Sequence, residues 1–136
     1  MKLQAERFEG SNAISRHGPD GVIVDNVAWT ASVLVPWKGL VEAWPVATFS
    51  ELTAEHFARI ARIGDLTGER APELVIFGSG PRIRFPAPAL LRPLIDKRIG
   101  VETMDTAAAC RTYNVLLGEG RAVVAALLFE AAAPTP

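Results

Sequence analysis

The sequence predicts an α/β fold: a central mixed β-sheet with helices packed on it, preceded by an N-terminal region of antiparallel β-ribbons. Two observations predict this architecture. Residues 13–44 contain short apolar segments separated by short turns, which is typical of antiparallel ribbons. From residue 53 onward, apolar runs alternate with segments of helical periodicity, and this order of strand, helix, strand, helix and strand is typical of βαβ units.

The first half is expected to form short strands joined by turns. Gly18-Pro19-Asp20-Gly21 has the chemistry of a turn, because proline fixes φ and glycine accepts a positive φ. Pro36 and Pro45 fall at strand ends, where a missing backbone N–H does no harm. The expected strands cover residues 13–16, 22–24, 32–35 and 40–44.

Three helices are expected in the second half. Thr53 can cap the first, over residues 54–63, and Gly64 can end it. The residues expected on its buried face are Phe57, Ile60 and Ala61. The second helix is expected over residues 88–97, where Pro93 predicts a kink or a late start. The side chains expected to be buried there are Leu90, Leu91, Leu94 and Ile95.

The third helix is expected over residues 106–117, capped by Asp105 and closed by Gly118-Glu119-Gly120. On this helix Cys110 shares an apolar stripe with Tyr113 and is expected to pack rather than react. The strands that alternate with the helices are expected at residues 74–77, 99–104 and 121–129.

Length and composition indicate one domain over residues 1–130, followed by a short proline-rich tail, residues 131–136, that is expected to be disordered. The 14 basic and 15 acidic residues give a net charge of −1, which argues against a dedicated nucleic-acid binder. The single cysteine excludes an internal disulfide. One cysteine and two distant histidines supply no metal-ligand cluster, so neither a metal nor a cofactor is expected.

Targeting signals are not recognisable in the sequence. The chain has no apolar run of the roughly 18 residues that a membrane span needs. Its first residues lack the apolar core of a signal peptide, and Glu6 fits a transit peptide poorly. We therefore expect a cytoplasmic bacterial protein.

The first candidate site follows the strand at residues 74–77. Gly78-Ser79-Gly80 suggests a dinucleotide loop, but the third glycine of that pattern would stand at Ile83 and no helix follows directly. A glycine turn that lets the chain leave a buried strand is the favoured interpretation. Contact with an anion through backbone N–H groups and Arg82 or Arg84 is the alternative.

Nucleophilic catalysis by Ser79 is disfavoured. A nucleophile elbow needs glycine two residues to either side, where this chain has Phe77 and Pro81. Neither His17 nor His56 is well placed as a base, so no catalytic residue is predicted.

The second candidate site is the start of the third helix. Thr106, Arg111 and Asn114 flank its apolar stripe, and a helix N-terminus presents free N–H groups. Capping and hydrogen bonds to neighbouring loops are the favoured interpretation, and recognition of a ligand or protein is the alternative. Trp29, Trp37 and Trp44 could each lie in the core, or one of them could form part of an interface.

Three segments carry a resemblance to a known family. They are Leu74–Gly80 (LVIFGSG), Phe85–Pro88 (FPAP) and Gly100–Leu116 (GVETMDTAAACRTYNVL). Together they resemble the Mth938-like domain family, once called domain of unknown function 498, over residues 8–128. The resemblance implies a compact three-layer α/β fold with a central mixed sheet. It also implies a role in protein interaction rather than catalysis, because a mitochondrial relative is an assembly factor of respiratory complex I.

The family has no agreed catalytic set to carry over. The positions that match its motifs are Gly78, Ser79, Gly80, Asp105, Thr106, Arg111, Tyr113 and Asn114. The family loop commonly reads Gly-Thr-Gly, so Ser79 is a departure that keeps the hydroxyl group.

Two functional hypotheses follow. The leading one is a small non-enzymatic module that binds protein partners and helps to assemble a membrane or respiratory complex, with peripheral membrane association and self-association both left open. The alternative is a small anionic-metabolite-binding protein or enzyme that uses the cleft between the Gly78–Arg82 loop and the Asp105–Asn114 helix start. The residues proposed for this cleft or interaction site are Gly78, Ser79, Gly80, Arg82, Thr106, Arg111 and Asn114.

Overall fold

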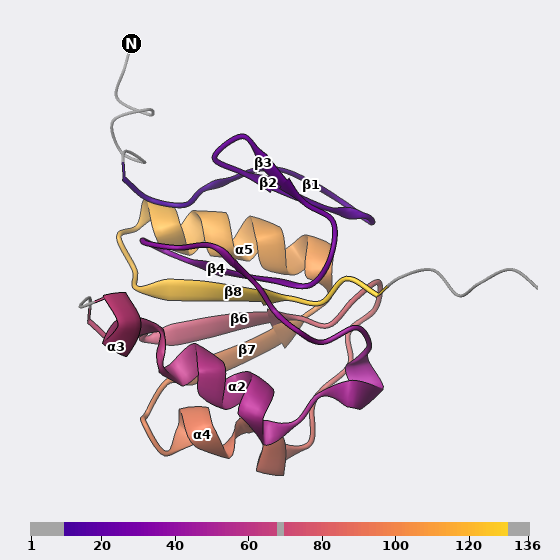
Figure 1. Cartoon of the computed structure of the whole chain (residues 1–136), viewed down its shortest axis with the longest axis vertical. Helices are drawn as coiled ribbons and strands as arrows, with labels where there is room; N and C mark the ends of the chain where they lie inside the picture. Colours follow the sequence, from indigo (N-terminus) through magenta and orange to yellow (C-terminus); the bar gives the residue numbers. More distant parts are fainter. Residues whose placement is uncertain (1–9, 68–69, 131–136) are drawn as a thin grey trace, which may run out of the picture.

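The computed structural model describes residues 10–67 and 70–130, and the predicted disordered tail at 131–136 lies outside the described residues. Two sheets and a set of helices build the fold (Figure 1). No helix in this described part is long and apolar enough to cross a membrane.

A mixed five-stranded sheet forms the centre, as predicted. Its order is β5-β4-β8-β6-β7, in which β6 pairs in parallel with β7 and β8, while β4 pairs antiparallel with β8 and β5. The strands are β4 (Val33–Pro36), β5 (Glu42–Ala43), β6 (Leu74–Gly78), β7 (Gly100–Met104) and β8 (Val123–Leu127). β8 and all of β6 except Leu74 are buried, as expected of strands covered on both faces.

The N-terminal ribbon is a separate antiparallel sheet with the order β1-β2-β3. It consists of β1 (Ile14–Gly18), β2 (Gly21–Val24) and β3 (Val27–Trp29), and β3 was not predicted. The hairpin between β2 and β3 turns on Asp25 and Asn26, whose φ angles are 50° and 64°. Asp and Asn accept this left-handed backbone and favour two-residue hairpins, so the sequence held a signal for β3.

The first helical segment differs from prediction at its end. α2 (Ala54–Ala61) begins after Thr53 and buries Phe57, Ile60 and Ala61, as expected. The prediction that Gly64 ends it was wrong. The N–H of Arg62 is shared between the carbonyls of Arg59 and Ile60, so the helix tightens there and the chain continues into α3 (Ile63–Thr67). A short 3₁₀ turn, η1 (Phe49–Glu51), precedes α2.

The second helical segment starts late, as Pro93 predicted. A 3₁₀ turn, η2 (Pro88–Leu91), leads into α4 (Arg92–Ile95), where Pro93 occupies the first turn and its missing N–H costs nothing. Leu94 is buried, and Leu90 and Leu91 are half-buried. Burial of Ile95 was predicted wrongly, since the side chain is 51% exposed. The prediction assumed one α-helix over residues 88–97. The segment instead begins as a 3₁₀ turn with about three residues per turn, so Ile95 lies on a different face from the one predicted.

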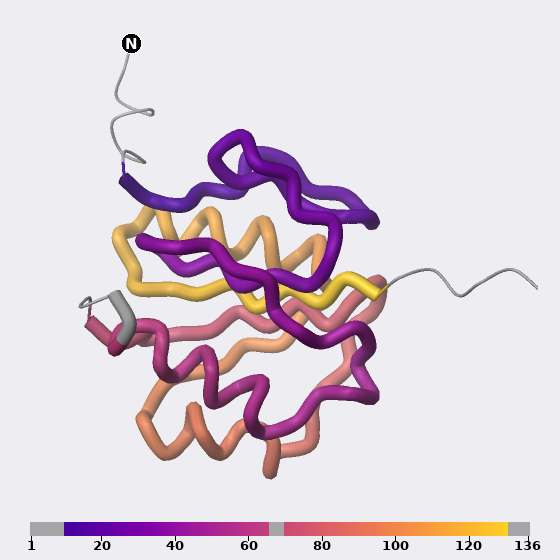
Figure 2. The backbone as a smooth tube through the Cα atoms, in the orientation of Figure 1, coloured from indigo at the N-terminus to yellow at the C-terminus, as the bar shows by residue number. Residues whose placement is uncertain are grey.

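α5 (Thr106–Gly118) and α2 cover opposite faces of the central sheet. Successive residues of β6 point to opposite sides. Phe77 packs edge-on against Phe57 of α2 with ring centroids 5.7 Å apart, whereas Gly78 faces Ala109 of α5. α4 packs against α2. β1 packs on α5, so α5 lies between the central sheet and the β1–β3 sheet (Figures 1 and 2).

Aromatic side chains fill the space between the sheet and α2. Trp44 packs edge-on against Phe57 and Phe77, with ring centroids 5.8 Å and 6.1 Å away, and its indole N–H donates to the carbonyl oxygen of His56. Trp44 and Trp37 are buried, and Trp29 is half-buried against the core. Of the three tryptophans, Trp29 therefore presents the most surface to a partner.

Tyr113 joins α5 to the N-terminal half of the chain. Its ring is fully buried, and its hydroxyl donates to the carbonyl oxygen of Asn12 at 2.8 Å and lies 3.0 Å from that of Pro36. Burial raises the pKa of the Tyr113 phenol, which keeps the hydroxyl a hydrogen-bond donor at neutral pH.

Replacing Tyr113 with phenylalanine tests this connection. Tyr113→Phe should lower the free energy of unfolding by about 1–2 kcal/mol, because the carbonyl oxygen of Asn12 loses the phenol as its donor, whereas that of Pro36 still accepts from the side-chain amide of Asn12. Urea unfolding followed by circular dichroism measures it. Val115→Ala, at a position on the same helix that is 61% exposed, is the control and should change stability by less than about 0.5 kcal/mol. Equal stabilities of Tyr113→Phe and the wild type would contradict this role.

Candidate functional site

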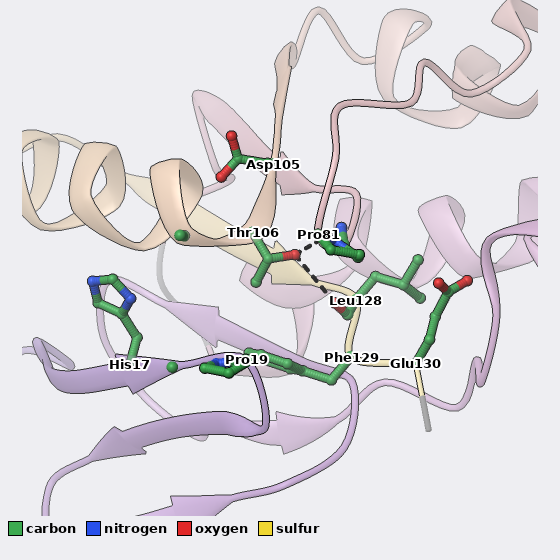
Figure 3. A pocket seen from close by; sticks show the side chains of 11 residues that line it. His17, Pro19, Pro81, Asp105, Thr106, Leu128, Phe129 and Glu130 are labelled. Carbon is green, nitrogen blue, oxygen red and sulfur yellow. Dashed lines mark hydrogen bonds between the residues drawn. The ribbon is translucent and has the colours of Figure 1, made fainter. Parts of the chain in front are cut away.

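The two predicted loops meet at the carboxyl ends of β6 and β7, where ligand sites of open α/β sheets commonly form. The hydroxyl of Thr106, at the start of α5, accepts from the N–H of Gly80 at 2.8 Å and donates to the carbonyl oxygen of Leu128 at 3.1 Å (Figure 3). The N–H of Thr106 donates to the carbonyl oxygen of Gly80 at 2.9 Å. One buried side chain thus ties the loop after β6, the first turn of α5 and the segment after β8 together.

Gly78 makes this close approach sterically feasible. A Cβ atom at this position would lie 3.0 Å from the Cα of Thr106 and 3.1 Å from the Cβ of Ala109. Both obstacles belong to the rigid start of α5 and have little freedom to shift. A side chain at position 78 would therefore push the helix away from β6.

Ser79 is wholly engaged in holding its own loop. Its buried hydroxyl accepts from the N–H of Arg84 at 2.8 Å and donates to the carbonyl oxygen of Arg82 at 2.9 Å. The carbonyl oxygen of Met104 lies 3.2 Å from the same hydroxyl. A serine whose donor and acceptor capacity is used in this way is not available as a nucleophile in this conformation.

Gly80 has a φ of +107° and lies against the side chain of Arg84. The guanidinium of Arg84 bonds to the carbonyl oxygen of Ser79, pairs with Glu130 at 3.0 Å and lies 4.8 Å above the ring of Phe49. Glu130 also accepts from the N–H of Phe49 at 2.7 Å. Burial raises the pKa of the Glu130 carboxyl, but the Phe49 N–H and Arg84 outweigh it, and the net pKa is lowered.

Asn114 acts as an extra strand partner for β1. Its amide oxygen accepts from the N–H of Ile14 at 2.9 Å, and its amide nitrogen donates to the carbonyl oxygen of Ile14 at 2.7 Å.

The side chains of Arg82 and Arg111 are exposed and make no hydrogen bond or ion pair within residues 10–67 and 70–130. We call the contact of the loop after β6 with the start of α5 and the segment after β8 the joint. Of the predicted site residues, it contains Gly78, Ser79, Gly80 and Thr106.

Cys110 packs in the core, as predicted. Its side chain is fully buried, and burial raises the pKa of the thiol to about 12, with Arg111 opposing that effect. Such a thiol stays protonated at neutral pH and is a poor nucleophile. Within the described residues, no group of three or more His, Cys, Asp or Glu side chains is arranged to hold a metal ion.

A pocket of about 600 Å³ opens beside the joint (Figure 3). The turn between β1 and β2, the loop after β6, the first turn of α5 and the segment after β8 form its walls. Its labelled lining residues are His17, Pro19, Pro81, Asp105, Thr106, Leu128, Phe129 and Glu130. Neither Arg82 nor Arg111 lines it, and its lining includes the carboxylates of Asp105 and Glu130 and the imidazole of His17.

Several pocket residues were missed at the sequence level. His17 and Pro19 belong to a turn that was recognised, but no local signal places that turn against α5. Phe129 and Glu130 follow β8, where the sequence shows only the end of an apolar run. Asp105 was predicted as a cap, and its carboxylate does accept from the N–H of Ala108 at 2.9 Å.

Comparison with known proteins gives consistent matches. A family model described as "Protein of unknown function (DUF498/DUF598)" matches residues 14–128. A crystal structure of a Bordetella parapertussis protein superposes with a TM-score of 0.76 at 36% identity, covering 89% of this chain and 98% of that one. The solution structure of a Bordetella pertussis protein, a Mth938-like domain, gives a TM-score of 0.76 at 31% identity, covering 88% of this chain and 87% of that one.

Two mammalian relatives also match. NADH dehydrogenase [ubiquinone] 1 alpha subcomplex assembly factor 3 of Bos taurus is 35% identical over 116 residues, which cover 85% of this chain and 59% of the bovine protein. The Mus musculus protein of the same name is 32% identical over 106 residues, covering 78% of this chain and 54% of its own length. The chain therefore spans just over half the length of these curated relatives.

The fold is that of a Mth938-like α/β domain. The chain belongs to the DUF498/DUF598 family, which confirms the resemblance noted from its sequence motifs.

Substitution of Gly78 tests the close approach of α5. Gly78→Ala should lower the free energy of unfolding by about 1–3 kcal/mol, because the new methyl group meets atoms of α5 that have little room to move. Gly18→Ala is the matched control: a Cβ there meets nothing within 4 Å, and its φ is not in the left-handed region. Chemical denaturation of both variants measures the difference. Equal stabilities of the two variants would contradict the packing argument.

Proposed function

We propose that this chain is a non-enzymatic assembly module that binds protein partners during the building of a respiratory complex of the NADH dehydrogenase type. The observation that carries the proposal is its similarity to assembly factor 3 of the bovine enzyme, at 35% identity over 85% of the chain. The matched part is the folded α/β domain itself, so a binding function carried by that domain is the natural one to share.

The chemistry of the candidate site supports an interaction role over catalysis. The hydroxyls of Ser79 and Thr106 are occupied by backbone groups of the protein, and the amide of Asn114 by Ile14. The Cys110 thiol is buried with a raised pKa. Among the titratable side chains that line the pocket, Asp105 and Glu130 accept hydrogen bonds from backbone N–H groups, whereas the imidazole of His17 has no hydrogen-bond partner within residues 10–67 and 70–130.

The composition of the pocket also weighs against the anionic-metabolite alternative. An anion needs cations or free N–H donors. Asp105 and Glu130 place carboxylates at this cleft, whereas Arg82 and Arg111 lie outside it.

Gene deletion in the source organism tests the proposal. Loss of the chain should reduce the amount of fully assembled NADH dehydrogenase on native gels and, with it, NADH oxidation by isolated membranes. Re-expression of the wild type should restore both. Re-expression of His17→Ala should restore them equally, because an assembly module does not depend on that imidazole.

Two results would overturn the proposal. Normal amounts of assembled enzyme in the deletion strain would remove the assembly role. Failure of His17→Ala to restore assembly, with the variant folded and expressed at wild-type level, would return the pocket to consideration as a chemical site.

A further inference from the structure

The connection between β6 and β7, residues 81–99, carries apolar side chains that the core does not cover. Phe85 is 71% exposed and Ile83 is 50% exposed. Figure 2 shows this connection running along the outside of the molecule before the chain re-enters the sheet as β7. Exposed large apolar residues grouped on one segment mark an interaction surface more often than scattered ones do.

Arg84 differs from its two exposed apolar neighbours, because its side chain packs on the protein. Arg84, between them, points inward to the carbonyl oxygen of Ser79 and to Glu130, and its guanidinium covers the ring of Phe49. On either side of Arg84, the side chains of Ile83 and Phe85 are exposed, and so is that of Arg82.

The charge of this connection differs in sign from that of the rest of the chain. Residues 81–99 contain five basic residues and one acidic residue, Asp96, a net charge of +4, whereas the whole chain has a net charge of −1. The remaining residues therefore sum to −5. Glu130 and Asp65, which lie outside this connection, pair with Arg84 and Lys97. Adding their two negative charges to the connection still leaves it with a net charge of +2. The basic residues are Arg82, Arg84, Arg92, Lys97 and Arg98.

We propose that residues 82–85 form a peripheral docking site for an anionic lipid surface. Phe85 and Ile83 insert at the level of the headgroups, and Arg82 contacts lipid phosphates. The rest of the basic connection adds long-range attraction to the negatively charged bilayer. Charge complementarity carries the choice of an anionic occupant.

The apolar pair favours a bilayer over an acidic protein segment. Ile83 and Phe85 line neither the pocket at α5 nor the one on the β1–β3 sheet. Side chains that project from a loop can enter a bilayer without any groove. This inference stands apart from the assembly role, because it concerns the purified chain and lipid alone.

Vesicle co-sedimentation of the purified full chain tests the proposal. The wild type should bind vesicles of phosphatidylcholine with 30 mol% phosphatidylglycerol at low salt, bind pure phosphatidylcholine at least tenfold more weakly, and be released by 0.5 M NaCl, because salt screens the attraction. The double variant Ile83→Ser/Phe85→Ser should bind the anionic vesicles at least tenfold more weakly. Arg82→Glu should weaken binding about fivefold or more.

Leu40→Ser is the matched control, because Leu40 is 74% exposed but belongs to the turn between β4 and β5. This variant should bind like the wild type, and all variants should keep the wild-type melting temperature, since the substituted side chains are exposed. Absence of wild-type binding to anionic vesicles would overturn the proposal. So would undiminished binding by the double variant, or binding to polyglutamate without binding to vesicles, which would identify an acidic protein as the occupant.

Discussion

The hydroxyl of Thr106 is the contact on which the arrangement of the candidate site depends. It satisfies two buried backbone groups at once, the N–H of Gly80 and the carbonyl of Leu128, which lie 26 and 22 residues away along the chain. A buried backbone group without a partner costs roughly 1–3 kcal/mol. The close approach allowed by Gly78 brings the hydroxyl within reach of both. The loop after β6, the start of α5 and the segment after β8 are therefore held as one unit.

This arrangement gives a structural meaning to two of the three segments that carry the family resemblance, Leu74–Gly80 and Gly100–Leu116. In the first motif, Gly78 admits the helix, Ser79 organises the loop and Gly80 adopts a positive φ beside Arg84. In the second, Asp105 caps α5 and Thr106 completes the joint. The same joint directs the chain into the loop that presents Ile83 and Phe85 to solvent. The motifs thus build a scaffold, and the surfaces we propose for binding lie beside it.

Local signals in the sequence predicted local features. The Asp105 cap, the burial of Cys110 and the late start at Pro93 each depend on residues a few positions apart, and the structure confirms all three. Ile95 was misplaced because a 3₁₀ turn changed the helical phase, and β3 was missed although Asp25-Asn26 signalled its hairpin. The partners of Thr106 and Asn114, and the walls of the pocket, come from elements that meet only in the folded chain. No spacing rule brings Asn114 to Ile14, 100 residues away.

The most direct test of the structural meaning of these motifs is a pair of substitutions at Thr106. Thr106→Val keeps the shape of the side chain but removes the hydroxyl, whereas Thr106→Ser keeps the hydroxyl. Hydrogen exchange at the Gly80 amide, measured with the free energy of unfolding, reports on the joint. We expect Thr106→Val to lose about 2–4 kcal/mol and much of the protection at Gly80, because two buried groups lose their partner, and Thr106→Ser to keep that protection. Wild-type stability and wild-type protection of Gly80 in Thr106→Val would contradict the account.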